Sequence, residues 1–285
     1  MLSHLYKIMG VSLVLSVVLN AGVYAENDAA VKIKWGYKGN IGPSRWAELD
    51  PQFALCGKGK QQSPINIIEK NSAAKSDLQI NYTSAPLDIG INDTTKLQIG
   101  KISTLFQDGH GIEVNFPADL IENIVINNET YQLIEFHIHT PSENTWHGQS
   151  FPAEIHFVHQ GPNGKVAVLG VFAKGGEESE EMQIVVDNIP HDQGQSHLIP
   201  GKSINPADLL PANKRHYRFQ GSLTTPPCSE GLQWFVFAEP ITISPAQIAR
   251  LRHAVGGSNA RPVQPLNGRS IYSIAESKQS PVQSD

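Results

Sequence analysis

Apolar and polar residues alternate with a period of two along much of the chain, a pattern that predicts β-strands. The clearest runs cover residues 133–139, 153–159, 165–172 and 232–237, which are rich in β-branched and aromatic side chains. Such runs outnumber helical patterns. We therefore predict a mainly β (α+β) protein, a single domain built on a large, mostly antiparallel sheet with a few peripheral helices.

Two segments carry helix signals instead. Ser244 and Pro245 offer an N-cap and a first-turn proline before residues 246–255, and Gly256 follows as a stop signal. Residues 178–187 form the second candidate, which ends before Pro190. Both helices are short, so we expect them at the periphery of the sheet.

The first 25 residues have the pattern of a secretory signal peptide. Lys7 provides a positive start, residues 8–19 an apolar core, and Val23-Tyr24-Ala25 a small-residue cleavage site. The alternative is a membrane anchor, but a spanning helix needs about 20 apolar residues and this run is shorter. We predict cleavage after Ala25, export to the periplasm or beyond, and no stable membrane span in the mature chain.

Composition describes an ordinary globule, with 40% hydrophobic and 17% charged residues. No linker, repeat or long charge run divides the chain, so we predict one domain over residues 26–275 and a polar, disordered tail over 276–285. The net charge of −5, with no basic stripe, argues against nucleic acid as a partner.

Cys56 and Cys228 are the two cysteines of the chain. An exported protein meets an oxidising compartment, which favours joining them in a disulfide. Two buried free thiols are the alternative.

Three histidines lie in two of the predicted strands. Period-two geometry places Glu135, His137 and His139 on one face of the first strand, and Glu154 and His156 on one face of the second. If the two strands are neighbours, the three imidazoles come together. Three neutral imidazoles leave a zinc ion one open tetrahedral position, which is the arrangement of catalytic rather than structural zinc.

The two glutamates strengthen this interpretation. A histidine that binds a metal usually gives its other ring N–H to a carboxylate or carbonyl, which fixes the tautomer. Glu135 and Glu154 each precede a histidine by two residues on the same face. The alternative is that these histidines are hydrogen-bonded structural residues, as most histidines in strands are.

Seven blocks of residues together resemble the α-class carbonic anhydrases, particularly the exported bacterial members. The central block is residues 136–144, Phe-His-Ile-His-Thr-Pro-Ser-Glu-Asn. The others follow the same order as in the family and lie at residues 35–37, 62–67, 108–110, 166–172, 221–230 and 259–269. The resemblance covers residues 35–271, nearly the whole mature chain.

This resemblance implies a zinc enzyme that hydrates carbon dioxide reversibly to bicarbonate and a proton, through attack by zinc-bound hydroxide. It also implies a twisted ten-stranded sheet with the metal at the bottom of a conical cavity. His137, His139 and His156 would bind Zn²⁺. Thr224 would accept the hydrogen of the hydroxide and donate its own to Glu143, which orients the attack.

The family pattern gives roles to further residues. His110 takes the proton-shuttle position, and its ordinary pKa of about 6.5 suits that task. The apolar wall for carbon dioxide would be formed by Val158, Val168, Leu223, Thr225 and Trp234. Hydrogen-bond partners around the metal ligands would be Glu135, Glu154, Tyr37 and Asn259. The disulfide would join Cys56 to Cys228. We leave a homodimer open.

Two positions depart from the family pattern. Glu135 and Asn144 stand where many members have Gln and His, and a carboxylate at Glu135 is expected to make its imidazole partner more basic.

Two other functions are alternatives to the enzyme. The main alternative is an inactive relative that acts as a binding module, although such relatives typically lack a zinc histidine. A zinc carrier is the other, but exposed His-rich tracts are absent from the sequence.

Overall fold

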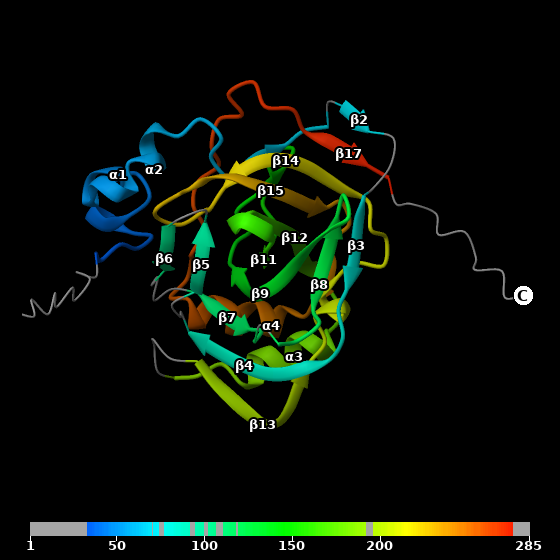
Figure 1. Ribbon diagram of the computed structural model, residues 1–285. Coiled ribbons are helices and arrows are strands. Elements are labelled where there is room, and N and C mark those ends of the chain that lie inside the picture. Colours follow the sequence, from blue (N-terminus) through cyan, green and yellow to red (C-terminus); the bar gives the residue numbers. More distant parts are fainter. Residues whose placement is uncertain are drawn as a thin grey trace, which may run out of the picture. The chain divides into compact units, whose positions relative to one another are not determined.

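A computed structural model describes residues 33–69, 71–73, 77–91, 95–99, 102–106, 111–117, 119–191 and 196–275. In this part of the chain one hydrogen-bonded path runs through ten strands, in the order β13-β4-β7-β9-β11-β12-β15-β14-β17-β2. Three more strands, β3, β8 and β16, pair beside this path and bring the sheet to 13 strands (Figure 1). The predicted ten-stranded sheet is therefore present, with short additions.

The strands of this sheet have the following bounds: β2 Asn71–Ala73, β3 Leu78–Asn81, β4 Ala85–Ile91, β7 Ile112–Asn115, β8 Asn123–Ile126, β9 Glu129–His139, β11 Ala153–Gln160, β12 Val166–Gly175, β13 Ser196–Ile204, β14 His216–Ser222, β15 Glu230–Phe237, β16 Ile241–Ile243 and β17 Tyr272–Ile274. Two small sheets pair β1 (Asn66–Ile67) with β10 (Thr145–Trp146), and β5 (Thr95–Ile99) with β6 (Ile102–Phe106).

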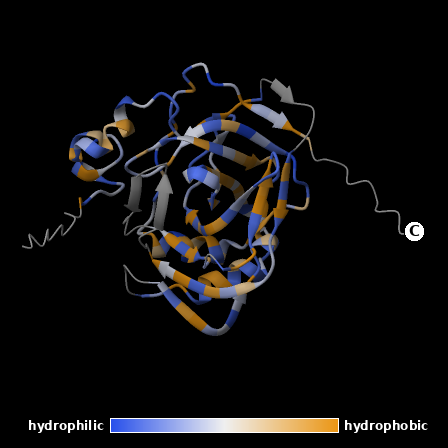
Figure 2. Cartoon of the chain, in the orientation of Figure 1, coloured by the Kyte–Doolittle hydropathy of each residue, from blue (hydrophilic) through white to orange (hydrophobic). Residues whose placement is uncertain are grey.

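The four predicted strands are β9, β11, β12 and β15, and the prediction that the sheet is mostly antiparallel is confirmed. β9, β11 and β12 are consecutive antiparallel neighbours. The central exception is β12, which runs parallel to β15. Figure 2 shows hydrophobic and polar residues alternating along the strands.

The sheet buries apolar residues on both faces, and β11 shows how they divide. Ile155 and Phe157 belong to the larger core cluster, whereas Val158 belongs to a second cluster on the other face. The larger cluster includes Met182 of α3 (Glu180–Asp187) and Leu251 of α4 (Pro245–Ala254). These two helices lie side by side (Figure 1) and cover one face of the sheet. The three predicted metal-binding histidines and Val158 are expected on the opposite face.

Both predicted helices form. Ser244 caps α4 through a reciprocal capping box with Gln247, as the Ser-Pro signal predicts. The other helix, α3, begins at Glu180, two residues later than predicted, because the Ser179 side chain accepts a hydrogen bond from Met182 N and caps it there.

The sequence pattern missed two four-residue helices, α1 (Trp46–Leu49) and α2 (Leu55–Lys58). They are too short to show a periodic pattern. Four 3₁₀ turns complete the elements of the described residues, at Gly39–Ile41, Pro51–Phe53, Pro162–Gly164 and Pro206–Leu209.

A disulfide joins Cys56 of α2 to Cys228, across a sequence separation of 172 and with 5.0 Å between the two Cα atoms. The expected pairing is confirmed. The bridge packs with Trp35 and Trp46 in a small separate cluster, so it attaches the N-terminal helices to the loop before β15.

Among the described residues, no helix is both long and apolar enough to cross a membrane. The predicted signal peptide and the predicted tail over 276–285 lie outside the described residues.

Candidate metal centre

The pairing of β9 with β11 brings the three predicted histidines together. His156 lies directly opposite His137, and Glu154 lies opposite His139. Directly opposite residues in antiparallel strands share a face, so the three imidazoles converge. One ring nitrogen from each histidine lies within 4.8 Å of the other two.

Hydrogen bonds on the far side of two rings determine which nitrogen faces the centre. Nδ1 of His137 lies 2.8 and 3.0 Å from the two carboxylate oxygens of Glu135. Nδ1 of His139 donates to the backbone carbonyl of Asn259 at 2.7 Å. Both acceptors fix the proton on Nδ1, so Nε2 is the ring nitrogen of each histidine that can bind a metal.

His156 is turned the other way. Its Nε2 lies 3.1 Å from Oε1 of Glu154, which leaves Nδ1 for the centre. Glu154 itself is fully buried and is held by three donors: the backbone N–H of Glu143 at 2.9 Å, the backbone N–H of Asn144 at 2.8 Å, and the side-chain amide of Asn144 at 2.7 Å. The predicted glutamate partners therefore both lie against their histidines.

Glu143 projects into the same centre. Its Oε1 accepts the backbone N–H of Arg261 at 2.8 Å, and its carboxylate is hydrogen-bonded to the side chain of Thr224. Its Oε2 lies 3.3 Å from Nε2 of His139 and 3.9 Å from Nδ1 of His156, the two nitrogens that face the centre.

Burial sets the electrostatics of this cluster. Loss of water around the carboxyl group raises the pKa of Glu143 to about 8 and that of Glu154 to about 7. Burial, followed by the neighbouring imidazoles, lowers the pKa of His139 and His156 well below the ordinary value. These two rings are therefore neutral near pH 7, which is the protonation state that a metal ligand needs.

The residues of the centre fit a zinc ion. Nε2 of His139 is buried and has no hydrogen-bond partner among the described residues. Oε2 of Glu143 is likewise buried without such a partner. Unpaired buried polar atoms are costly, and a cation between these atoms would satisfy them. Three imidazoles with no thiolate are a donor set that suits zinc.

The predicted apolar wall forms one cluster beside the centre. Val158 pairs with Val168, which pairs in turn with Trp234 in β15, and all three are buried with Leu223. The Trp234 ring meets the His156 ring edge-on, with 4.9 Å between centroids. Thr225 is half-buried at the loop that follows Thr224.

Two serines fix the start of the Leu223–Thr224 loop. Ser222 Oγ accepts the backbone N–H of Ser63 at 2.8 Å, and Ser63 Oγ accepts the backbone N–H of Ser222 at 3.2 Å. The backbone carbonyl of Ser222 accepts the indole N–H of Trp234 at 3.0 Å. A Cβ at Gly221 would lie 2.3 Å from Ser63 Oγ, so this close approach requires glycine.

Other predicted residues lie further out or outside the described part of the chain. Asn259 holds His139 through its carbonyl, and its side chain bonds Thr140 N at 2.8 Å and the carbonyl of Ile138 at 3.0 Å. The Tyr37 ring packs edge-on against Trp35 and Trp46. His110, the predicted shuttle, lies outside the described residues.

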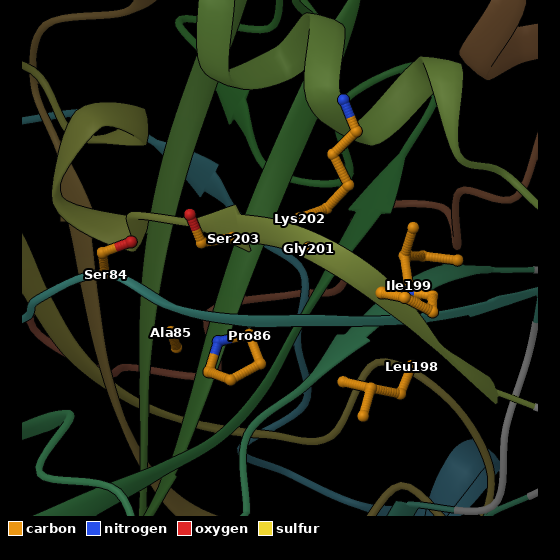
Figure 3. Close-up of a pocket in the computed structure, with 9 residues that line it drawn as sticks. Ser84, Ala85, Pro86, Leu198, Ile199, Gly201, Lys202 and Ser203 are labelled. Carbon is orange, nitrogen blue, oxygen red and sulfur yellow. The ribbon is translucent and has the colours of Figure 1, made fainter.

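A hollow of about 400 Å³ lies elsewhere, between β4 and β13 (Figure 3). None of the predicted site residues line it, and β7 separates β4 from β9 in the sheet. Its lining comprises Ser84, Ala85, Pro86, Leu198, Ile199, Pro200, Gly201, Lys202 and Ser203. This hollow is thus distinct from the histidine centre.

Sequence reasoning missed the supporting role of Arg261. Its buried guanidinium donates to the carbonyls of Ser63 at 2.6 Å and Cys56 at 2.9 Å, while its backbone holds Glu143. Arg261 stands in a block that the family resemblance includes, but nothing local in the sequence indicates partners so distant along the chain.

Comparison with known proteins defines the class. A family model described as eukaryotic-type carbonic anhydrase matches residues 41–275. A protein named carbonic anhydrase from Pectobacterium carotovorum is 37% identical, over 90% of this chain and 98% of its own length. The chain therefore belongs to the eukaryotic-type (α) carbonic anhydrase family, and its enzyme class is carbonic anhydrase.

Solved structures agree with this assignment. An α-carbonic anhydrase from Thermovibrio ammonificans, in complex with the inhibitor sulfanilamide, matches with a TM-score of 0.74 at 39% identity, over 84% of this chain and 99% of that one. The family also includes proteins with other names. Dioscorin DB3L from Dioscorea polystachya is 32% identical, over 81% of this chain and 82% of its own length.

Proposed function

We propose that this protein is a zinc-dependent carbonic anhydrase that converts carbon dioxide and water reversibly into bicarbonate and a proton. The observation that carries the proposal is the convergence of His137, His139 and His156. Nδ1 of His137 and Nδ1 of His139 are hydrogen-bonded to Glu135 and to the Asn259 carbonyl, and Nε2 of His156 lies 3.1 Å from Oε1 of Glu154. When bound, zinc would act as a Lewis acid that lowers the pKa of a coordinated water to about 7, a value established for this family.

The residues around the centre would orient the reaction. An ionised carboxylate only accepts hydrogen bonds, so Thr224 donates to Glu143 and keeps its oxygen lone pairs available for the nucleophile. Burial alone favours a protonated Glu143, but a divalent cation in the centre acts in the opposite direction and favours the ionised form.

The apolar wall would receive the substrate. Carbon dioxide has no hydrogen to donate and gains little from polar contacts, whereas a dry surface next to the nucleophile concentrates it. Val158, Val168, Leu223 and Trp234 provide such a surface on the same sheet face as His156. We assign removal of the product proton to His110, which a family resemblance supports.

The N-terminal segment and the disulfide support a proposed location outside the cytoplasm. Residues 1–25 are proposed to direct export and to be removed, and the Cys56–Cys228 disulfide supports an oxidising compartment for the mature chain.

The test of this function is metal content together with activity. Purified protein starting at residue 26 is expected to hold about one zinc per chain and to hydrate carbon dioxide. His137→Ala should release the metal and abolish turnover but keep the fold, because the zinc is catalytic. His191→Ala, at an exposed position away from the centre, is the matched control.

Three results separate the possible functions. Zinc binding with hydration supports the enzyme. Zinc binding without hydration indicates a carrier, and the absence of both indicates an inactive binding module. Full activity in metal-free His137→Ala protein would contradict the proposed chemistry.

A further inference from the structure

Glu154 accepts three hydrogen bonds beside the centre, and residue 144 makes two of them. The backbone N–H of Asn144 binds Oε2 at 2.8 Å, and the side-chain amide N–H binds Oε1 at 2.7 Å. Asn144 therefore holds both oxygens of one carboxylate, and Glu143 N adds a third donor at Oε2. Asn144 and Glu154 are both completely buried.

The orientation of the Asn144 amide is determined by its neighbours. Its Oδ1 accepts the backbone N–H of Ile65 at 3.0 Å, a group that can only donate. Its Nδ2 faces a carboxylate oxygen, which only accepts when ionised. The opposite amide orientation would place two acceptors together and two donors together, so one orientation is strongly favoured.

Ile65 is itself fixed on the backbone. Its carbonyl accepts the N–H of Thr145 at 3.1 Å, and the parallel pairing of β1 with β10 begins at the next residues, Asn66 and Thr145. A continuous chain of hydrogen bonds thus runs from this small sheet through Asn144 to Glu154, whose Oε1 faces Nε2 of His156 at 3.1 Å.

We propose that Asn144 is a positioning residue: it fixes Glu154, and Glu154 holds His156 with Nδ1 turned toward the metal. This inference rests on the proposed zinc site. It assigns a task to the position at which the chain departs from the histidine of many relatives. Partners of this kind typically change metal affinity by 10–100-fold when they are removed.

Asn144→Asp is the most direct test because it keeps the size of the side chain and the backbone donor. It replaces the amide N–H by an oxygen that would lie against Oε1 of Glu154, so the pair becomes repulsive. We expect this variant to release zinc to an excess of chelator roughly 10–100-fold faster than the natural protein. The cobalt-substituted form should also show a changed visible absorption spectrum.

Two further variants keep the test decisive. Asn144→Ala removes the donor without adding charge and should also accelerate zinc release, so it decides the question if Asn144→Asp does not fold. Asn144→His replaces the amide donor by a ring N–H that can also bind Glu154, so this variant should release zinc at close to the natural rate.

The matched control is Gln247→Glu. Gln247 is a buried amide in α4, the helix that packs on the sheet face away from Val158, and its Nε2 donates to Ser179 O at 2.7 Å. This variant should lower the melting temperature without changing zinc release. Natural release rates in both Asn144→Asp and Asn144→Ala, or equal acceleration in Gln247→Glu, would overturn the inference. A zinc-loaded natural protein that fails to hydrate carbon dioxide would end the proposed function but leave this comparison valid.

Discussion

Thr224 and Glu143 form the pair on which orientation of the nucleophile is proposed to depend. Both side chains are buried, and Oε1 of Glu143 also accepts the backbone N–H of Arg261. Because the Arg261 backbone holds Glu143, the Thr224 hydroxyl that donates to this carboxylate keeps its oxygen available to accept.

Thr224→Val tests this pair with almost no change in side-chain volume. The variant should retain zinc, since no metal-binding atom is altered, but should lose about 100-fold in kcat/KM, the lower range for removing one aligned hydrogen-bonding group. Stopped-flow hydration assays with matched zinc analysis measure both quantities. Thr225→Val, at the half-buried neighbouring position, is the control. An unchanged kcat/KM in Thr224→Val would remove Thr224 from the mechanism.

The strand β11 carries a second buried histidine that the proposed chemistry does not use. His159 Nδ1 lies 3.3 Å from the carbonyl of Ala167, so Nε2 accepts from the Tyr82 hydroxyl at 2.6 Å. Burial lowers the pKa of His159 to about 3, against about 6.5 in an unfolded chain. The folded state therefore excludes a proton that the unfolded state binds.

This difference predicts acid sensitivity. The contribution of neutral His159 to stability is complete above about pH 6.5 and is lost as the pH falls toward 3, by about 2 kcal/mol between pH 7 and pH 5. His159→Gln keeps a donor and an acceptor but does not titrate, so its unfolding free energy should fall less over that range. Urea titrations at several pH values measure this. His191→Gln should behave as the natural protein does, and an equal pH dependence in His159→Gln would contradict the prediction.

At the scale of the whole molecule, the disulfide connects segments that the sheet does not join directly. Cys56 lies in α2 and Cys228 just before β15, and the bridge closes a loop of 172 residues. By loss of chain entropy in the unfolded state, closing such a loop stabilises the folded state by roughly 5 kcal/mol.

The double variant Cys56→Ser/Cys228→Ser should therefore melt roughly 10–20 °C below the natural protein, because 1 kcal/mol corresponds to about 2–4 °C in a domain of this size. Calorimetry at equal zinc loading makes the comparison. Non-reducing peptide mapping of exported natural protein should show the crosslinked pair. Equal melting temperatures would show that the bridge adds no stability.

Local sequence was sufficient for the strands and the core of the metal centre. Period-two alternation predicted β9, β11, β12 and β15, and the two-residue spacing of His137 and His139 placed their side chains on one face. Ser244, Pro245 and Gly256 located α4 for a similar reason, since capping depends on residues within one turn. The role of Glu143 and Thr224 came instead from resemblance to a family, because no local rule pairs residues so far apart.

The choice of the ring nitrogen that faces the centre depends on tertiary contacts. His139 depends on a carbonyl 120 positions away, and Glu143 on a backbone N–H 118 positions away. Strand pairing and loop packing bring these groups together, and alternation along one strand contains no information about them. Period-two alternation was enough to assign the faces on which the metal-binding side chains lie. The orientation of the rings and the hydrogen bonds between Asn144 and Glu154 beside His156 depend on contacts between distant segments, so they required the fold.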